Sequence, residues 1–194
     1  LWPSIVVSSL YLAYGYSLNQ CFDNKIDGSV EIVKGSYISF KRAILLGGFI
    51  FLFNFLFVFI YSVRMVPLVL LGGLIGFFYS APPLRLKEIP VLGLLANSLC
   101  FIPLFLIGYV PVRALDRNAF LMAIFIFIFF LPIDLIHQLN DFSEDRDKGF
   151  RTTAIACGVK KTIGLIIICL IILNFWLLLV SWLTGSSFFL LLLT

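Results

Sequence analysis

The sequence of 194 residues is dominated by apolar side chains: 61% of its residues are hydrophobic, 12% are charged, and the mean hydropathy is +1.10. A soluble domain cannot bury so large an apolar fraction, so a soluble fold, including that of a soluble enzyme, is excluded. The net charge of +4 would suggest a nucleic acid partner in a soluble protein, but in a membrane protein it reports the sidedness of the loops, and we expect no nucleic acid partner.

Six continuous apolar runs are long enough for membrane-spanning helices, each of which takes roughly 20 mostly apolar residues. They cover about residues 1–20, 43–63, 65–82, 89–110, 118–138 and 162–183, and a seventh begins at Phe188. The runs lack the alternation of membrane β-strands. The sequence therefore predicts an all-α fold, a polytopic transmembrane helix bundle that forms a single domain over residues 1–194. Because both ends of the chain lie within apolar runs, we expect this domain to be truncated at both ends.

Basic residues divide unevenly between the two sides of the predicted bundle. When the loops are assigned alternately to two sides, Arg64, Arg113 and Arg117 fall on one side. The other side receives all the remaining basic residues: Lys25, Lys34, Lys41, Arg42, Arg85, Lys87, Arg146, Lys148, Arg151, Lys160 and Lys161. By the positive-inside rule, this richer side faces the cytoplasm. Every acid except Asp116 falls on it too, and because acids do not set topology, their clustering needs another cause.

The first acidic cluster lies where the first apolar run ends. Asn19, Asp23 and Asp27 follow one another at positions i, i+4 and i+8, which stacks their oxygen atoms on one face of a helix over about 12 Å. A carboxylate at the bilayer centre costs about 2.5 to 3.5 kcal/mol, so such acids usually line a cavity or bind a cation. The spacing therefore predicts a cation site at this helix end.

A second acidic pair, Asp141 and Asp145, follows the fifth run, with Asp134 and Gln138 further back on nearly the same face. Mg²⁺ prefers oxygen ligands and combines one or two carboxylates with waters and substrate phosphates. Either group of acids alone is as well explained by a solvated helix end. Two groups on one side favour a pair of Mg²⁺ sites that hold a diphosphate and neutralise the charge that develops as its C–O bond breaks.

A third polar segment, YSAPPLRLKE at 79–88, ends the third run on the same side. Pro82 and Pro83 stop the helix and favour an extended chain, which presents Arg85 and Lys87. An Arg can donate paired hydrogen bonds to phosphate, and a Lys supplies a point charge. The two basic residues are therefore either diphosphate ligands or anchors at the membrane surface.

These three motifs together resemble those of the UbiA superfamily of intramembrane prenyltransferases. Residues 19–27 look like its first motif, NDxxDxxxD, with Gln20 in place of the usual Asp. Residues 141–152 are similar to its second motif, in which DxxxD is followed by basic, Gly and Thr positions. The segment at 79–88 is similar to that of the chlorophyll-synthase and archaeal ether-lipid branches. Order, spacing and sidedness agree over nearly the whole chain.

The resemblance implies a nine-helix bundle, of which this chain holds about six to seven helices, and a Mg²⁺-dependent transferase. The enzyme would move an isoprenoid chain from a prenyl diphosphate to an aromatic or lipid-precursor acceptor at the cytoplasmic side of the membrane. Two Mg²⁺ ions would be held by Asn19, Asp23, Asp27, Asp141 and Asp145, whose four carboxylates would be catalytic. The prenyl diphosphate would contact Asn19, Lys34, Tyr79, Arg85, Lys87 and Arg146. Expected partners are the prenyl diphosphate, a lipid-soluble acceptor and membrane lipids.

The sequence leaves two other functions open. An ion-coupled transporter would bind its ions at membrane acids, although such acids would lie near the bilayer centre rather than at helix ends. A non-catalytic relative kept as a membrane scaffold would account for Gln20. Single residues stay open as well: His137 either acts on an acceptor proton or forms hydrogen bonds at a helix end, and Asp134 either lines the substrate pathway or has a structural part.

Overall fold

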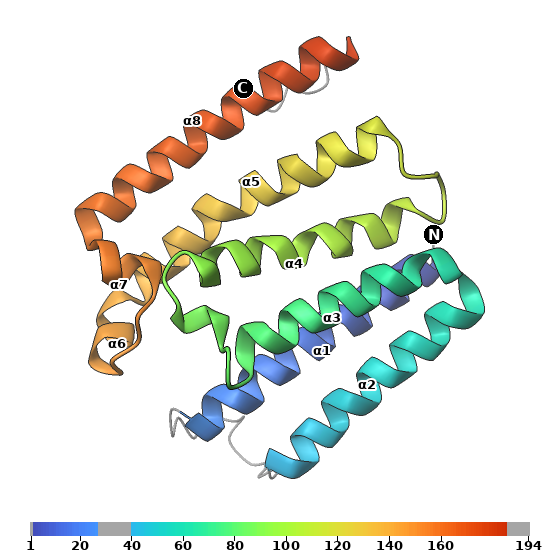
Figure 1. Ribbon diagram of the computed structural model, residues 1–194, viewed down its shortest axis with the longest axis horizontal. Coiled ribbons are helices and arrows are strands. Elements are labelled where there is room, and N and C mark those ends of the chain that lie inside the picture. The colour runs from blue at the N-terminus through green and yellow to red at the C-terminus, as the bar shows by residue number, and fades with distance from the viewer. Residues whose placement is uncertain (1, 27–39, 186–194) are drawn as a thin grey trace. The chain divides into compact units, whose positions relative to one another are not determined.

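The computed structural model describes residues 2–26 and 40–185, and every regular element in these ranges is a helix, as the sequence predicts (Figure 1). The long helices are α1 (Trp2–Ile26), α2 (Phe40–Tyr61), α3 (Val66–Ser80), α4 (Leu92–Tyr109), α5 (Arg117–Asn140) and α8 (Val159–Thr184). The short ones are α6 (Phe142–Asp147) and α7 (Thr153–Cys157), together with the 3-10 helices η1 (Val63–Met65) and η2 (Leu86–Glu88).

Five segments are long and apolar enough to cross a membrane: α2, α4, α5, α8 and the run Val63–Ser80 that contains α3. The all-α membrane fold is therefore confirmed, and five of the six predicted spans meet this criterion. The first predicted span coincides with the helix α1, and its crossing of the membrane stays a prediction. Although α1 has 25 residues, serine, tyrosine and asparagine side chains interrupt its apolar positions. It also continues past residue 20, where the apolar run ends, and so carries Asp23 on a helix. The run predicted from Phe188 lies outside the described residues.

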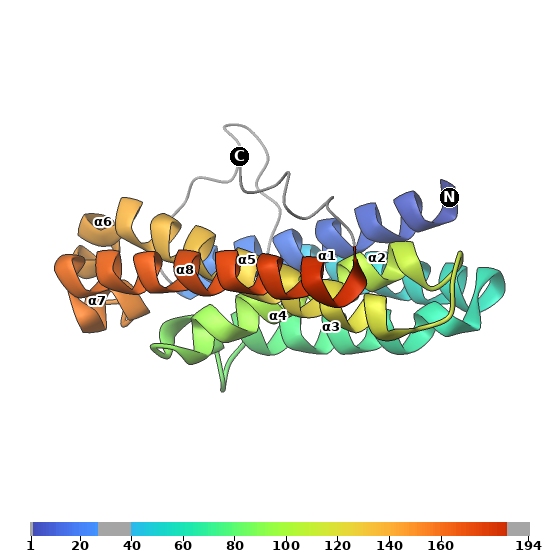
Figure 2. The same cartoon turned by 90° about the horizontal axis from the view of Figure 1, so that it is seen from above.

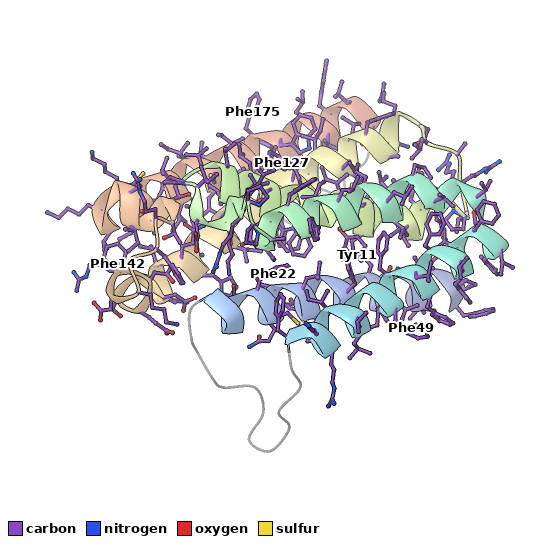
Figure 3. All side chains as sticks on the ribbon, turned by 60° about the horizontal axis from the view of Figure 1, so that its bottom comes forward. Tyr11, Phe22, Phe49, Phe127, Phe142 and Phe175 are labelled. Atoms are coloured by element: carbon purple, nitrogen blue, oxygen red, sulfur yellow. The ribbon has the colours of Figure 1, made fainter. Side chains whose placement is uncertain are left out.

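The chain divides into two compact units, and the first contains Leu1–Lys87 and Pro103–Ala114. In this unit α1, α2 and α3 lie side by side (Figure 1). Tyr11 lies among these helices in a buried cluster, whereas Phe49 points outward from α2 and is 66% exposed (Figure 3). The Tyr11 ring lies so close to Gly72 that a Cβ added there would overlap it. Small residues of this kind let membrane helices pack closely.

The second unit contains Glu88–Ile102 and Leu115–Thr194. Within it α5 packs along α8, and the short helices α6 and α7 lie together at one end of this pair (Figures 1 and 2). The Arg117 guanidinium donates to the Leu183 carbonyl at 2.6 Å, and the Trp176 indole donates to the Leu121 carbonyl at 3.3 Å. These bonds join the two long helices at the end opposite α6 and α7, so each unit has its own set of tertiary contacts.

Helix ends in the second unit follow from local sequence. Asp116 caps α5, where its Oδ1 accepts the Ala119 N–H at 2.9 Å. Thr152 caps α7 in the same way, accepting the Ile155 N–H at 3.5 Å. Gly158 then separates α7 from α8 at a φ of 78°, a conformation that favours glycine. The polar segment that follows α5 is therefore built from two short helices, α6 and α7, rather than from one long helix.

Candidate functional site

In the first unit, the end of α1 meets the basic segment that follows α3. The Asp23 carboxylate forms an ion pair with the Lys87 ammonium, and its Oδ1 lies 3.4 Å from the Arg85 Nη2. The Asn19 Oδ1 accepts from the Ser80 hydroxyl at 3.3 Å and from the Lys87 ammonium at 3.4 Å. Because one ammonium touches both Asn19 and Asp23, these two side chains lie on the same face of α1, as their spacing predicts.

Burial makes this first acidic cluster more than a pair of surface charges. The Arg85 side chain is 7% exposed, that of Lys87 15% and that of Asp23 24%. Charged groups so little exposed are found almost only where they are paired. The cluster therefore holds a carboxylate, an amide and two cations in a small, partly dry space at one end of the first unit.

The turn after α3 brings Arg85 to this place. The helix ends at Ser80, ahead of Pro82 and Pro83, which cannot continue it. The Arg85 N–H then donates to the Ala81 carbonyl at 2.9 Å. Arg85 itself has a φ of 37°, in the left-handed region that residues other than glycine rarely adopt. Unusual backbone of this kind persists where surrounding contacts fix it, and it is common at functional sites.

The oxygen atoms of this cluster suit a small, hard cation. Asn19 and Asp23 offer an amide oxygen and a carboxylate within reach of one point, now taken by the Lys87 ammonium. Mg²⁺ is commonly bound by one or two carboxylates, with waters and phosphate oxygens completing its shell. No group of three or more His, Cys, Asp and Glu side chains converges within the described residues. The residues present therefore fit a Mg²⁺ site that substrate completes, rather than a closed protein site.

Three other residues were predicted for this site from the sequence. Tyr79 is half-buried in the last turn of α3, one residue before Ser80. Asp27 and Lys34 lie outside the described residues, so their predicted roles stay predictions.

In the second unit, the second acidic pair does not continue α5 as one ladder of side chains. α5 ends at Asn140, Asp141 lies at the junction, and Asp145 belongs to α6. The Asp145 N–H donates to the Asp141 carbonyl at 2.8 Å, which keeps the two residues one helical turn apart. Because α5 ends before Asp141, the two acids do not extend the ladder of Asp134 and Gln138 within one helix, and the expectation that all four share a face stays a prediction.

The surroundings of this pair are open to solvent. Asp141 is exposed and Asp145 is half-buried. Arg146 is exposed as well, and its Nε lies 3.9 Å from an Asp147 carboxylate oxygen. Nearby, a hydrogen bond from Lys148 lowers the pKa of Glu144. The Asp141 carboxylate therefore lies on a solvent-exposed part of the second unit.

Behind the second acidic pair lies a polar group that the sequence only partly revealed. The Asn97 amide donates to the Asp134 Oδ1 at 3.0 Å, and the Gln138 amide donates to the Asp134 Oδ2 at 3.1 Å. We call these three residues the amide clamp. Sequence reasoning noted Asp134 and Gln138 but missed Asn97. The available signal was an asparagine inside the apolar run 89–110, where a polar side chain needs a partner. His137, by contrast, is exposed, and its carbonyl accepts the Asp141 N–H.

Comparison with protein families gives a match over the whole sequence. The model of the UbiA prenyltransferase family matches residues 1–194. A curated relative, the lycopene elongase/hydratase of Haloarcula japonica, is 28% identical over 107 residues, which cover 55% of this chain and 36% of that protein. The matched part thus spans about a third of that relative's length.

Solved structures of similar fold come from the same group of proteins. A UbiA homolog from Archaeoglobus fulgidus bound to GPP and Mg²⁺ gives a TM-score of 0.81 at 18% identity, covering 94% of this chain and 67% of that one. The same homolog bound to Cd²⁺ gives 0.82 at 18% identity, covering 99% and 70%. Digeranylgeranylglyceryl phosphate synthase gives 0.74 at 15% identity, covering 95% and 65%. At such low identities the likeness shows the fold alone.

Proposed function

The chain belongs to the UbiA prenyltransferase family, and we propose that it acts as a membrane enzyme that transfers an isoprenoid chain from a prenyl diphosphate to a lipid-soluble acceptor, with Mg²⁺ as cofactor. The observation that carries the proposal is the first acidic cluster, where Asn19 and Asp23 share one helix face and meet Arg85 and Lys87. The proposal is supported by structures of a similar fold, a UbiA homolog bound to GPP or to DMAPP with Mg²⁺.

Each of the two groups of acids would hold its own Mg²⁺ ion. Asn19, Asp23 and Asp27 would hold one Mg²⁺, and Asp141 and Asp145 a second. Bound Mg²⁺ would supply the positive charge that a diphosphate needs as it leaves a carbon atom. The case for the first group includes the contacts around Asp23, whereas that for the second rests on its i, i+4 spacing and on membership of the family.

The basic residues would complete the binding of the diphosphate. Arg85 and Lys87 already lie against one carboxylate, and a diphosphate placed beside Asp23 would offer the same donors more negative charge. Hydrogen bonds between charged groups are about twice as strong as those between neutral ones. Tyr79, Lys34 and Arg146 are proposed as further ligands from their place in the motifs.

The transfer itself needs no covalent bond to the protein. The bond between the prenyl carbon and the diphosphate oxygen breaks, and its electron pair leaves with the diphosphate. The allylic cation that results is attacked by an electron pair of the acceptor, which then releases a proton. The protein's task is to hold the diphosphate, balance its charge and keep water from the cation.

The proposed site faces the cytoplasm, because the basic loops do so under the positive-inside rule. Cysteine variants at the exposed positions Lys41, Leu84 and Arg146 should react with a membrane-impermeant thiol reagent only after cells are opened. Labelling of any of the three in sealed cells would contradict this orientation. The same variants with Arg113→Cys as the opposite-side control complete the test.

The function is tested with full-length protein in membranes supplied with geranyl diphosphate. A prenylated lipid that appears by mass spectrometry, and that is lost with a chelator, supports the proposal. Arg85→Gln should then raise the apparent KM for the diphosphate about tenfold or more, because a charge-assisted hydrogen bond contributes about 1.5 to 3 kcal/mol. A scaffold or a transporter would give no product with any prenyl diphosphate tested.

A further inference from the structure

A chain of hydrogen bonds runs through the amide clamp to the start of α7, entirely within the second unit. The Gln138 Nε2 donates to Asp134, while the Gln138 Oε1 accepts the Ala154 N–H at 3.1 Å. The neighbouring Thr153 hydroxyl oxygen accepts the Val91 N–H at 2.9 Å. The start of α7 is thereby tied to α5 and to the segment that leads into α4.

The Gln138 contact closes a loop that contains the second acidic pair. Residues 141–151 lie between the end of α5 at Asn140 and the capping residue Thr152, and the bond from Ala154 to Gln138 joins the two ends. Thr153 and Ala154 are fully buried, so this end of the loop is anchored while Asp141 is exposed. Metal ligands are commonly oriented by such hydrogen-bonded partners behind them.

A carboxylate at position 134 fits this arrangement for a specific reason. Asp134 receives two N–H donors, one on each oxygen. Gln138 cannot reverse its amide without turning its own donors toward the Ala154 N–H. An asparagine at position 134 would set its NH₂ group against the donor of Gln138, or against that of Asn97 as long as Asn97 keeps its present orientation. A carboxylate accepts from both amides in their present orientations, whereas an asparagine would require Asn97 to reverse its amide as well.

We propose that Asp134 is a positioning residue: by fixing the Gln138 amide, it holds the loop 141–151 closed and so orients Asp141 and Asp145 toward a divalent ion. This inference rests on the proposed function for those two acids, and it assigns Asp134 to their support rather than to a substrate pathway. Asn97, which lies on α4, helps to fix the Asp134 carboxylate through its own hydrogen bond.

The first test measures hydrogen–deuterium exchange of the metal-free protein in lipid nanodiscs. Asp134→Asn and Gln138→Leu should each speed exchange at Ala154 and through residues 141–151 on the order of tenfold, since each removes a bond of the chain. Asn174→Leu is the matched control, because that amide lies on α8 of the same unit and donates to its own helix, at the Leu170 carbonyl. Unchanged exchange in both clamp variants would overturn the proposal.

A double variant separates the hydrogen-bond pattern from the charge at position 134. In Asp134→Asn with Gln138→Glu, the new carboxylate at position 138 can accept both from Ala154 and from the new amide at position 134, whose oxygen can accept from Asn97. Slow exchange should then return. A catalytic proton acceptor at Asp134 would not be rescued by this swap, so rescue of Mg²⁺ dependence as well as of exchange supports positioning. Failure of rescue with both proteins folded contradicts it.

The second test is a titration with Mg²⁺ alone, read by thermal unfolding. Asp134→Asn should raise the Mg²⁺ concentration for half of the effect about 10- to 100-fold, the usual loss when a supporting partner of a metal site is removed. Faster exchange with unchanged Mg²⁺ response would leave a clamp without a link to the metal, and so would refute the positioning role. If the wild-type protein shows no Mg²⁺ response, the proposed metal function fails, whereas the exchange data still decide whether the clamp exists.

Discussion

The two acidic groups show opposite solutions to placing carboxylates at the edge of a membrane. In the first cluster, Asp23 is largely buried and pairs with Arg85 and Lys87, which come from a different part of the chain. In the second pair, Asp141 is exposed, and behind it the half-buried Gln138 side chain accepts the Ala154 N–H. A buried acid needs counter-charges before any metal arrives, but an exposed acid needs only a fixed position. The two groups should therefore respond differently to mutation.

Loss of a carboxylate from either group should have the largest effect. If each holds a Mg²⁺ ion where charge develops in the transition state, Asp23→Ala and Asp145→Ala should each lower kcat about 10²- to 10³-fold, or about 3 to 4 kcal/mol. Because both would act on one leaving group, the double variant should be much less active than wild type but far from additive. Prenyl transfer measured against Mg²⁺ concentration checks this. Full activity in either single variant would break the two-metal proposal.

Removal of a counter-charge should show the difference between the two acidic groups in the stability of the metal-free protein. Lys87→Gln leaves the Asp23 carboxylate with reduced compensation in a largely buried place, which should lower the free energy of unfolding on the order of 3 kcal/mol. Added Mg²⁺ should restore part of the loss, because the ion can balance Asp23 in place of the ammonium. Thermal unfolding with and without Mg²⁺ measures both effects. An equal loss under the two conditions would show that Asp23 does not bind the ion.

A packing change tests whether the first cluster depends on the helices that carry it. Gly72→Ala would drive a methyl group into the Tyr11 ring between α1 and α3, and overpacking of this kind costs about 1 to 3 kcal/mol. Gly76→Ala on the same helix is the control, since nothing lies within 4 Å of the added atom. The melting temperature and the Mg²⁺ response of both variants are compared. Equal behaviour of the two would contradict the close packing of α1 on α3.

The helices themselves could largely be predicted from the sequence. A helix that crosses lipid must be long and apolar, and its backbone groups must be hydrogen-bonded within it. Five apolar runs could therefore be located within a few residues. The end of α1 was harder to place, because polar side chains interrupt its apolar run while the helix continues to Ile26. The break at Asp141 was missed because no proline or glycine marks it in the sequence.

The contacts within the site could be predicted only in outline. The i, i+4 spacing of Asn19 and Asp23 correctly placed them on one face, because that follows from helix geometry alone. The contacts of Lys87 with Asp23 and with Asn19 join residues 64 and 68 positions apart, and such contacts depend on how α1 packs on α3. The bond between Asn97 and Asp134 likewise joins two helices. A single sequence carries the residue types for these contacts but no information on which helices meet.

The smallest effect is expected at the exposed ion pair that resembles the buried one in chemistry. Lys148 donates to Glu144 at 2.6 Å across one helical turn, and the Glu144 side chain is 66% exposed. Lys87 and Asp23 form the same kind of ammonium–carboxylate pair in a largely buried place. The pKa of Glu144 is lowered by this hydrogen bond, so its stabilising effect is present above the unfolded-state pKa and is lost as the pH falls through the folded-state pKa. Water and salt screen the pair at all these pH values. Lys148→Gln should therefore leave the melting temperature near pH 7 unchanged at low and at high salt, under conditions where Lys87→Gln lowers it. A comparable fall in both variants would show that burial does not set the strength of these pairs, and the contrast between the two acidic groups would have to rest on position alone.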